Sequence, residues 1–176
     1  MTGLYIHIPF CASRCIYCGF YSTTLPELQD KYVDALCREM ELRAALPDAD
    51  KHISTIYLGG GTPSQLTHDN LERLFLYIYK VYDVDPNAEI TMECNPDDVT
   101  PKLLCGLPVN RVSMGMQTFD NNRLKFLHRR HDGSEAIRAV DILRQAGIHN
   151  ISIDLMFGFP EEALDDWLAD ISQALA

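Results

Sequence analysis

Short apolar segments alternate along this chain with longer segments that carry a helical spacing of apolar residues, and this alternation restricts the fold most. The apolar segments are 4–7 residues long, rich in β-branched or bulky side chains, and lie at 4–8, 55–58, 90–94, 111–116 and 151–157. Such runs are typical of strands buried on both faces of a parallel sheet. Helical spacing occupies the segments between and after them, at 28–46, 68–82, 120–127, 134–146 and 162–175. The sequence therefore predicts an α/β fold with a parallel sheet and right-handed crossovers.

Length and composition favour one globular domain. The chain has 176 residues, of which 47% are apolar and 23% charged, as in ordinary globular proteins. No apolar run approaches the roughly 20 residues of a membrane span. The first residues lack the basic region of a secretory signal, which predicts a cytoplasmic protein. A net charge of −10 argues against non-specific binding to nucleic acid.

A CxxxCxxC motif, formed by Cys11, Cys15 and Cys18, follows the first predicted strand directly. Three thiolates on one short loop can converge on a soft metal centre. A structural zinc site normally has four protein ligands, and the nearest candidate for a fourth, His7, lies in the strand before the loop. Three cysteines suit a four-iron cluster that leaves one iron open to a small-molecule ligand. We therefore favour a [4Fe-4S] cluster over zinc.

Five segments, read together with the cysteine loop, resemble the radical S-adenosylmethionine (SAM) superfamily and, within it, the oxygen-independent coproporphyrinogen III oxidase family. In order they are YIHIPFC at 5–11, LGGGTPS at 58–64, ECNP at 93–96, VSMGMQTF at 112–119 and DLMFGFP at 154–160. The resemblance implies a partial parallel (βα) barrel of six units, of which about five are present. We therefore expect residues 1–176 to be an incomplete radical SAM core domain, without the sixth strand and the C-terminal domain.

The resemblance also implies a SAM site at the ends of the strands. Gly60, Gly61 and Thr62 would hold the methionyl amine and neighbouring groups of SAM. Glycine suits this turn because it lets the backbone approach a ligand closely. Glu93, at the end of the third strand, would contact the ribose or the amine of SAM.

Further residues complete the implied site. Gln117 is a neutral donor and acceptor for a ribose hydroxyl or a carboxylate, and Arg129 can pair with the methionyl carboxylate. Tyr5 and Tyr17 match family positions that contact SAM. Asp154 lies inside an otherwise apolar strand, where an unpaired carboxylate is costly to bury. We therefore predict a functional or networked role for Asp154.

The residues after Cys18 distinguish two functions. In the superfamily, an electron from the cluster cleaves SAM to methionine and a 5′-deoxyadenosyl radical, which abstracts hydrogen from a substrate. The oxidases of the family carry a further cysteine two positions after the motif, where this chain carries Phe20. In this it resembles the HemW-type heme chaperones. Two hypotheses stay open: a heme chaperone that keeps the cluster and the SAM site, and an enzyme that decarboxylates two propionates of coproporphyrinogen III to vinyls.

The expected partners follow from the same resemblance. They are SAM, heme or a porphyrinogen, an electron donor and a heme-acceptor protein. An incomplete barrel would also leave the strand at 151–157 as an unpaired apolar edge. Because such edges invite pairing with another chain, we expect self-association through it.

Overall fold

The computed structural model describes residues 2–176 and has the predicted alternation of strands and helices. The strands are β1 (Thr2–Ile8), β2 (His52–Gly60), β3 (Asp83–Cys94), β4 (Arg111–Gln117) and β5 (Asn150–Leu155). The helices are α1 (Gln29–Ala44), α2 (His68–Val81), α3 (Asn121–Phe126), α4 (Gly133–Gln145) and α5 (Leu164–Leu175). Single 3-10 turns occur at Pro26–Leu28, Pro63–Gln65 and Pro96–Asp98. None of the helices in residues 2–176 has the length and apolar character to cross a membrane.

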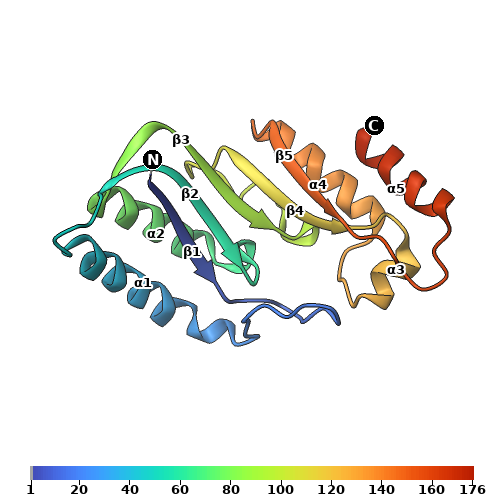
Figure 1. Ribbon diagram of the computed structural model, residues 1–176, viewed down its shortest axis with the longest axis horizontal. Coiled ribbons are helices and arrows are strands. Elements are labelled where there is room, and N and C mark those ends of the chain that lie inside the picture. Colours follow the sequence, from blue (N-terminus) through green and yellow to red (C-terminus); the bar gives the residue numbers. More distant parts are fainter. Residues whose placement is uncertain (1) are drawn as a thin grey trace.

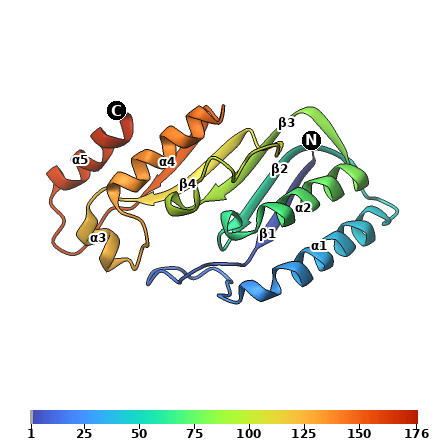
Figure 2. The same ribbon diagram turned by 180° about the vertical axis from the view of Figure 1, so that it is seen from behind.

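All five strands belong to one parallel sheet with the order β1-β2-β3-β4-β5. Helices α1, α2 and α4 cover one face of this sheet (Figure 2), and the opposite face is turned toward the viewer in Figure 1. Strands β1 and β5 are the two edges, so the sheet is open. The predicted parallel α/β architecture is confirmed.

The hydrophobic core lies between the sheet and the helices. Ile56 and Leu58 of β2 and Met92 of β3 are buried there against apolar residues of α2 such as Leu74 and Ile78. Successive side chains of a strand point to opposite faces. The residues between these core positions therefore point to the open face, which is where polar side chains collect.

Strands β2 and β3 are longer than their apolar segments indicate. They contain nine and twelve residues, and the N-terminal part of β3, from Asp83 to Asn87, is largely exposed and polar. The apolar segments mark only the buried C-terminal parts of these strands, because only those parts pack against the helices.

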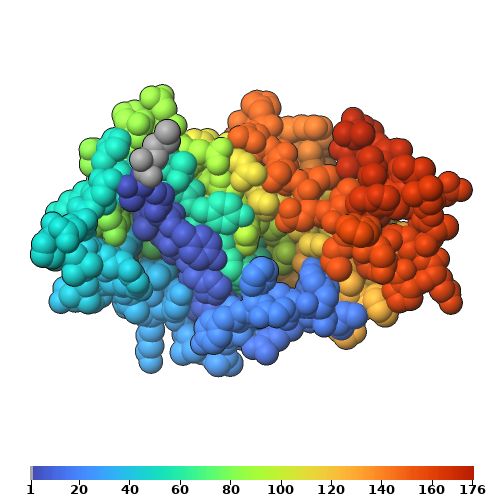
Figure 3. All heavy atoms as spheres, viewed as in Figure 1, coloured from blue at the N-terminus to red at the C-terminus, as the bar shows by residue number. Residues whose placement is uncertain are grey.

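The open face is hollow at the C-terminal ends of the strands. Seen as atoms in Figure 3, the segment after β1 (blue) borders this face on one side and the segment after β5 (orange to red) on another. The loops that follow the strands thus surround a common space, as they do in other open parallel sheets that bind ligands at the carboxyl ends of their strands.

Candidate functional site

The cysteine loop is held at both of its ends. Phe10 and Thr23 form an isolated parallel bridge, with Cys11 N donating to Thr23 O at 2.9 Å and Thr23 N donating to Pro9 O at 2.7 Å. At its middle, Ile16 N donates to Leu127 O at 3.3 Å. The loop is therefore fixed against β1 and against the segment after α3.

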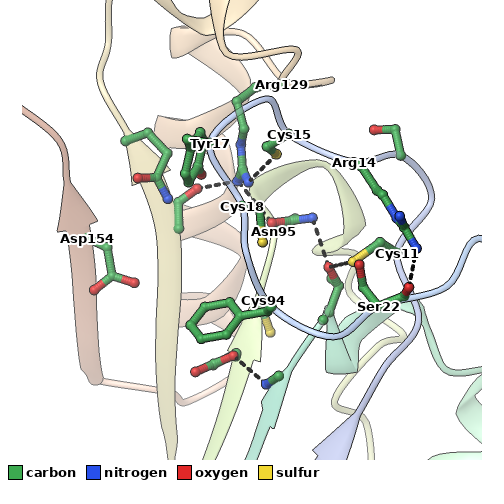
Figure 4. A pocket seen from close by; sticks show the side chains of 18 of the residues that line it. Cys11, Arg14, Cys15, Tyr17, Cys18, Ser22, Cys94, Asn95, Arg129 and Asp154 are labelled. Carbon is green, nitrogen blue, oxygen red and sulfur yellow. Dashed lines mark hydrogen bonds between the residues drawn. The ribbon is translucent and has the colours of Figure 1, made fainter. Parts of the chain in front are cut away.

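The three thiols of this loop are free and face one cavity (Figure 4). Cys11 and Cys15 are half-buried and Cys18 is exposed. The cavity lies at the C-terminal ends of the strands and encloses about 810 Å³ of empty space, including its open mouth. The predicted site residues that line it are Cys11, Cys15, Tyr17, Cys18, Gly60, Gly61, Thr62, Glu93, Gln117, Arg129 and Asp154.

Tyr5 is the predicted site residue that the structure places outside this cavity. Its ring lies on the open face, stacked on Tyr57 with 6.1 Å between the ring centroids. Its hydroxyl lies 3.2 Å from His7 Nδ1. Tyr5 therefore lies beside the cavity, next to Tyr57 and His7, and its contact with a ligand stays a prediction.

The ring of His7 is already engaged on both nitrogens. Its Nε2 lies 3.1 Å from the carbonyl oxygen of Tyr21, so this nitrogen carries the proton and Nδ1 accepts from the Tyr5 hydroxyl. His7 is absent from the residues that line the cavity. These contacts count against the zinc alternative, in which His7 would be the fourth ligand.

The glycine turn after β2 packs tightly against β1. Gly60 has φ +118°, and a Cβ there would lie 2.4 Å from His7 Nδ1, so no larger residue fits. At Gly61 a Cβ would lie 2.8 Å from the carbonyl carbon of Pro9 and 3.0 Å from the carbonyl oxygen of Phe10. Gly60 thus packs against the His7 ring, and Gly61 packs against the backbone that leads into Cys11.

The Glu93 carboxylate is bound by groups of β2. Tyr57 Oη donates to Oε1 at 2.8 Å and Gly60 N donates to Oε2 at 3.0 Å. Burial, together with the hydrogen bond to Glu93, raises the pKa of Tyr57 to about 12, so Tyr57 stays a neutral donor at physiological pH. The carboxylate is thus oriented before any ligand arrives.

Arg129 reaches the cavity from the loop after α3. Its Nη2 donates to Asn95 Oδ1 at 2.9 Å and to the carbonyl oxygen of Gly115, and its Nη1 lies 3.6 Å from Cys15 Sγ. Its Nε is buried and has no hydrogen-bond partner among the described residues. A buried donor without a partner is costly, whereas the Arg129 guanidinium as a whole borders the cavity.

Gln117 and Tyr17 lie beside Arg129. Gln117 has φ +72°, at an irregularity between β4 and β5 that turns its side chain into the cavity. At Gly115 a Cβ would lie 2.9 Å from Gln117 Nε2, so the glycine leaves room for this side chain. Burial raises the pKa of Tyr17 to about 12, while the Arg129 charge opposes the rise.

Asp154 is not buried as the sequence predicts. The sequence predicts a costly buried carboxylate, but the side chain is exposed and faces the cavity from β5 (Figure 4). Strand β5 is an edge strand of this sheet, paired with β4 on one side only. The energetic argument for a role of Asp154 is therefore wrong, although its position on the cavity agrees with a ligand contact.

The donor set fits a sulfur-bound cluster together with a polar ligand. Among residues 2–176, no three His, Cys, Asp or Glu side chains are close enough to hold a single metal ion. A four-iron cluster is larger than one ion, and each of its thiolates binds a different iron. Three free thiols on one loop, a tight glycine turn and the cationic side chain of Arg129 suit such a cluster and a carboxylate-bearing ligand.

Comparison with known proteins decides the family. A model of the radical SAM superfamily matches residues 5–174 of the chain. The chain belongs to the radical SAM superfamily. This membership agrees with the position of the cysteine loop directly after β1.

Relatives that are named heme chaperones match nearly the whole chain. The heme chaperone HemW of Synechocystis sp. is 37% identical over 99% of this radical SAM chain and 44% of that protein. The HemW of Escherichia coli is 37% identical over 98% of the chain and 47% of that protein. The chain thus spans about half the length of these relatives.

A solved structure shares the fold closely. The structure of coproporphyrinogen III oxidase (HemN) from Escherichia coli matches with a TM-score of 0.89 and 30% identity, over 98% of this chain and 41% of that one. The expected resemblance to the HemN and HemW group is confirmed.

Two residues with clear roles in the cavity escaped the sequence argument. Tyr57 orients Glu93, and Asn95 bonds both Arg129 and Thr62. Position 57 lies between the core residues Ile56 and Leu58, so strand periodicity alone places it on the open face. Asn95 directly follows β3 in the ECNP segment at 93–96, but its partners come from distant segments.

Proposed function

We propose that residues 1–176 are the incomplete core domain of a cytoplasmic radical SAM protein of heme or porphyrin metabolism, of the HemW heme-chaperone type. The observation that carries the proposal is the meeting of three free thiols with Gly61, Glu93 and Arg129 in one cavity. The similarity to HemW proteins over nearly the whole chain supports the chaperone function. The partners in this proposal are SAM, heme, an electron donor and a heme-acceptor protein.

In this proposal the thiolates of Cys11, Cys15 and Cys18 would hold a [4Fe-4S] cluster. When bound and reduced, such a cluster supplies the electron that cleaves the sulfonium of SAM. Arg129, whose guanidinium borders the cavity, would pair with the methionyl carboxylate of SAM, because charge-assisted bonds from guanidinium to carboxylate are strong.

The other cavity residues would orient the remainder of SAM. Gly60 and Gly61 would let the methionyl part approach the backbone, and Thr62 adds a buried hydroxyl beside it. Glu93 and Gln117 would receive the amine or the ribose hydroxyls, and Tyr17 and Asp154 line the same cavity. Tyr5 would act from outside it, through its stack on Tyr57.

A second candidate function is that of an oxygen-independent coproporphyrinogen III oxidase, and the structural match to HemN supports it. Phe20 favours the chaperone. It lines the cavity with 70% of its surface exposed, at the position where the oxidases resembling this chain carry a cysteine. A phenyl ring there offers apolar contact and no thiol, so it cannot ligate or donate a proton to a substrate.

The cluster is tested by iron and sulfide analysis after anaerobic reconstitution. We expect the wild-type chain to hold about four irons, as this cluster type requires, and Cys15→Ala to lose most of them. Cys105→Ala is the matched control, because Cys105 is also free but exposed and outside the cavity. Full iron content in Cys15→Ala would contradict the assignment.

The choice between the two functions is tested at the full length of the HemW relatives. Reduced protein, SAM and coproporphyrinogen III are incubated without oxygen beside a heme titration. We expect saturable heme binding and no conversion. Formation of protoporphyrinogen at turnover rates, without saturable heme binding, would reverse the choice.

A further inference from the structure

Asn95 occupies a rigid position between the cysteine loop and the strand ends. It follows β3 and precedes Pro96, which restricts the residue before it to extended backbone, and Asn95 has φ −87° and ψ 145°. Its N–H donates to Ser64 Oγ at 3.2 Å, and Ser64 Oγ donates to Asp98 Oδ2 at 2.7 Å. Arg130, which pairs with Asp98 at 2.8 Å, completes this support.

The side chain of Asn95 connects two groups that contact cysteine sulfurs (Figure 4). Its Oδ1 accepts from Arg129 Nη2 at 2.9 Å, and Arg129 Nη1 donates to Cys15 Sγ at 3.6 Å. Its Nδ2 donates to Thr62 Oγ1 at 3.5 Å, and Thr62 Oγ1 donates to Cys11 Sγ at 3.5 Å. Both routes therefore start at one amide and end on a sulfur of the motif.

The chemistry of the partners fixes the orientation of this amide. A guanidinium has donors only, so the oxygen of Asn95 must face Arg129 and its NH₂ group must face Thr62. The Thr62 hydroxyl then accepts from Asn95, which leaves its single hydrogen for Cys11 Sγ. Thr62 is 5% exposed, so water does not compete effectively for this hydroxyl.

We propose that Asn95 is a positioning residue that aims Thr62 and Arg129 at the sulfurs of Cys11 and Cys15 and thereby raises the potential at which a cluster held there is reduced. The proposal rests on the proposed function, in which these cysteines hold a cluster. The reduced cluster carries one more negative charge than the oxidised one, so donors to its thiolates stabilise the reduced form. Groups that orient such contacts around a metal site commonly tune it.

The test is the midpoint potential of the reconstituted cluster, followed by electron paramagnetic resonance in a redox titration of the chain. We expect Asn95→Ala and Thr62→Val each to shift the potential to more negative values. Because both act on the same route to Cys11, the shift of the double variant is expected to be smaller than the sum of the single shifts.

The matched control is Asn110→Ala. The Asn110 side chain also makes two hydrogen bonds to the chain, accepting from Ile90 N and donating to Ala88 O at 2.8 Å each, but it lies away from the cavity. We expect this variant to keep the wild-type potential. A merely structural loss at Asn95 would lower the amount of cluster while leaving the potential of the remaining cluster unchanged.

The outcomes separate the two proposals. An unchanged potential in Asn95→Ala and Thr62→Val, with cluster bound, overturns the role of Asn95 and leaves the proposed function intact. A shift of equal size in Asn110→Ala also overturns it. A wild-type chain that binds no iron overturns the proposed function and this inference with it.

Discussion

Replacement of Gly61 by alanine tests whether the glycine turn and the entry to the cysteine loop form one packed unit. A Cβ at position 61 would lie 2.8 Å from the carbonyl carbon of Pro9 and 3.0 Å from the carbonyl oxygens of Ile8 and Phe10. All three are backbone atoms, so no side-chain rotation can relieve the contact. The segment that leads into Cys11 must therefore move.

The magnitude follows from two opposing effects. Adding a methyl group to a tightly packed position costs about 1–3 kcal/mol. Alanine also restricts the unfolded chain, which returns about 0.4–1 kcal/mol. The middles of these two ranges are about 2 and about 0.7 kcal/mol, so we expect Gly61→Ala to lower the free energy of unfolding by about 1.3 kcal/mol. With a slope of about 2 kcal/mol per molar urea, the midpoint falls by about 0.5–1 M.

The assay is urea denaturation of the cluster-free chain, with Gly19→Ala as the control. Gly19 lies in the cysteine loop, and a Cβ there would meet no atom within 4 Å. Its replacement is expected to leave stability unchanged or to raise it by up to about 1 kcal/mol. If Gly61→Ala unfolds at the same urea concentration as Gly19→Ala or above it, the packing argument is refuted.

Two further predictions concern pH and association. Burial, reinforced by the Arg129 charge, lowers the pKa of His131 to about 4. Between pH 6.5 and 4 the unfolded chain therefore binds more protons than the folded chain, and the free energy of unfolding falls as the pH drops through this window. Between pH 7 and pH 5 this histidine lowers the free energy of unfolding by about 2 kcal/mol. Urea denaturation at both pH values should show a smaller loss in His131→Gln than in wild type. Replacement of the exposed His149 is the control and should leave the loss as large as in wild type. If the β5 edge pairs with another chain, light scattering should show a mass that rises with protein concentration. Phe157→Lys, just after β5, should reduce this association more than Leu76→Lys on α2, and the two side chains are similarly exposed at 75% and 71%. A constant monomer mass would contradict this second prediction.

The sequence by itself determined the elements and the set of residues that meet. Apolar runs of strand length mark β1 to β5, and the periodicity of each run separates core residues such as Leu58 from open-face residues such as Glu93. The strands are parallel, so their carboxyl ends lie at one edge of the sheet. Motifs that follow successive strands therefore gather there, which is why most predicted site residues line one cavity.

Only the tertiary structure decided how these residues contact one another. Tyr5 and His7 are hydrogen-bonded to each other and lie outside the cavity. Asp154 is exposed at the β5 edge, and Asn95 connects Thr62 to Arg129. The contacts of Asn95 depend on how the ends of neighbouring strands and the loops that follow them pack together. Strand periodicity specifies on which face a side chain lies, but a hydrogen bond needs an atom placed within a few tenths of an ångström. Around Arg129 that placement joins segments distant in the chain, because Asn95 is 34 positions and Cys15 114 positions away from it.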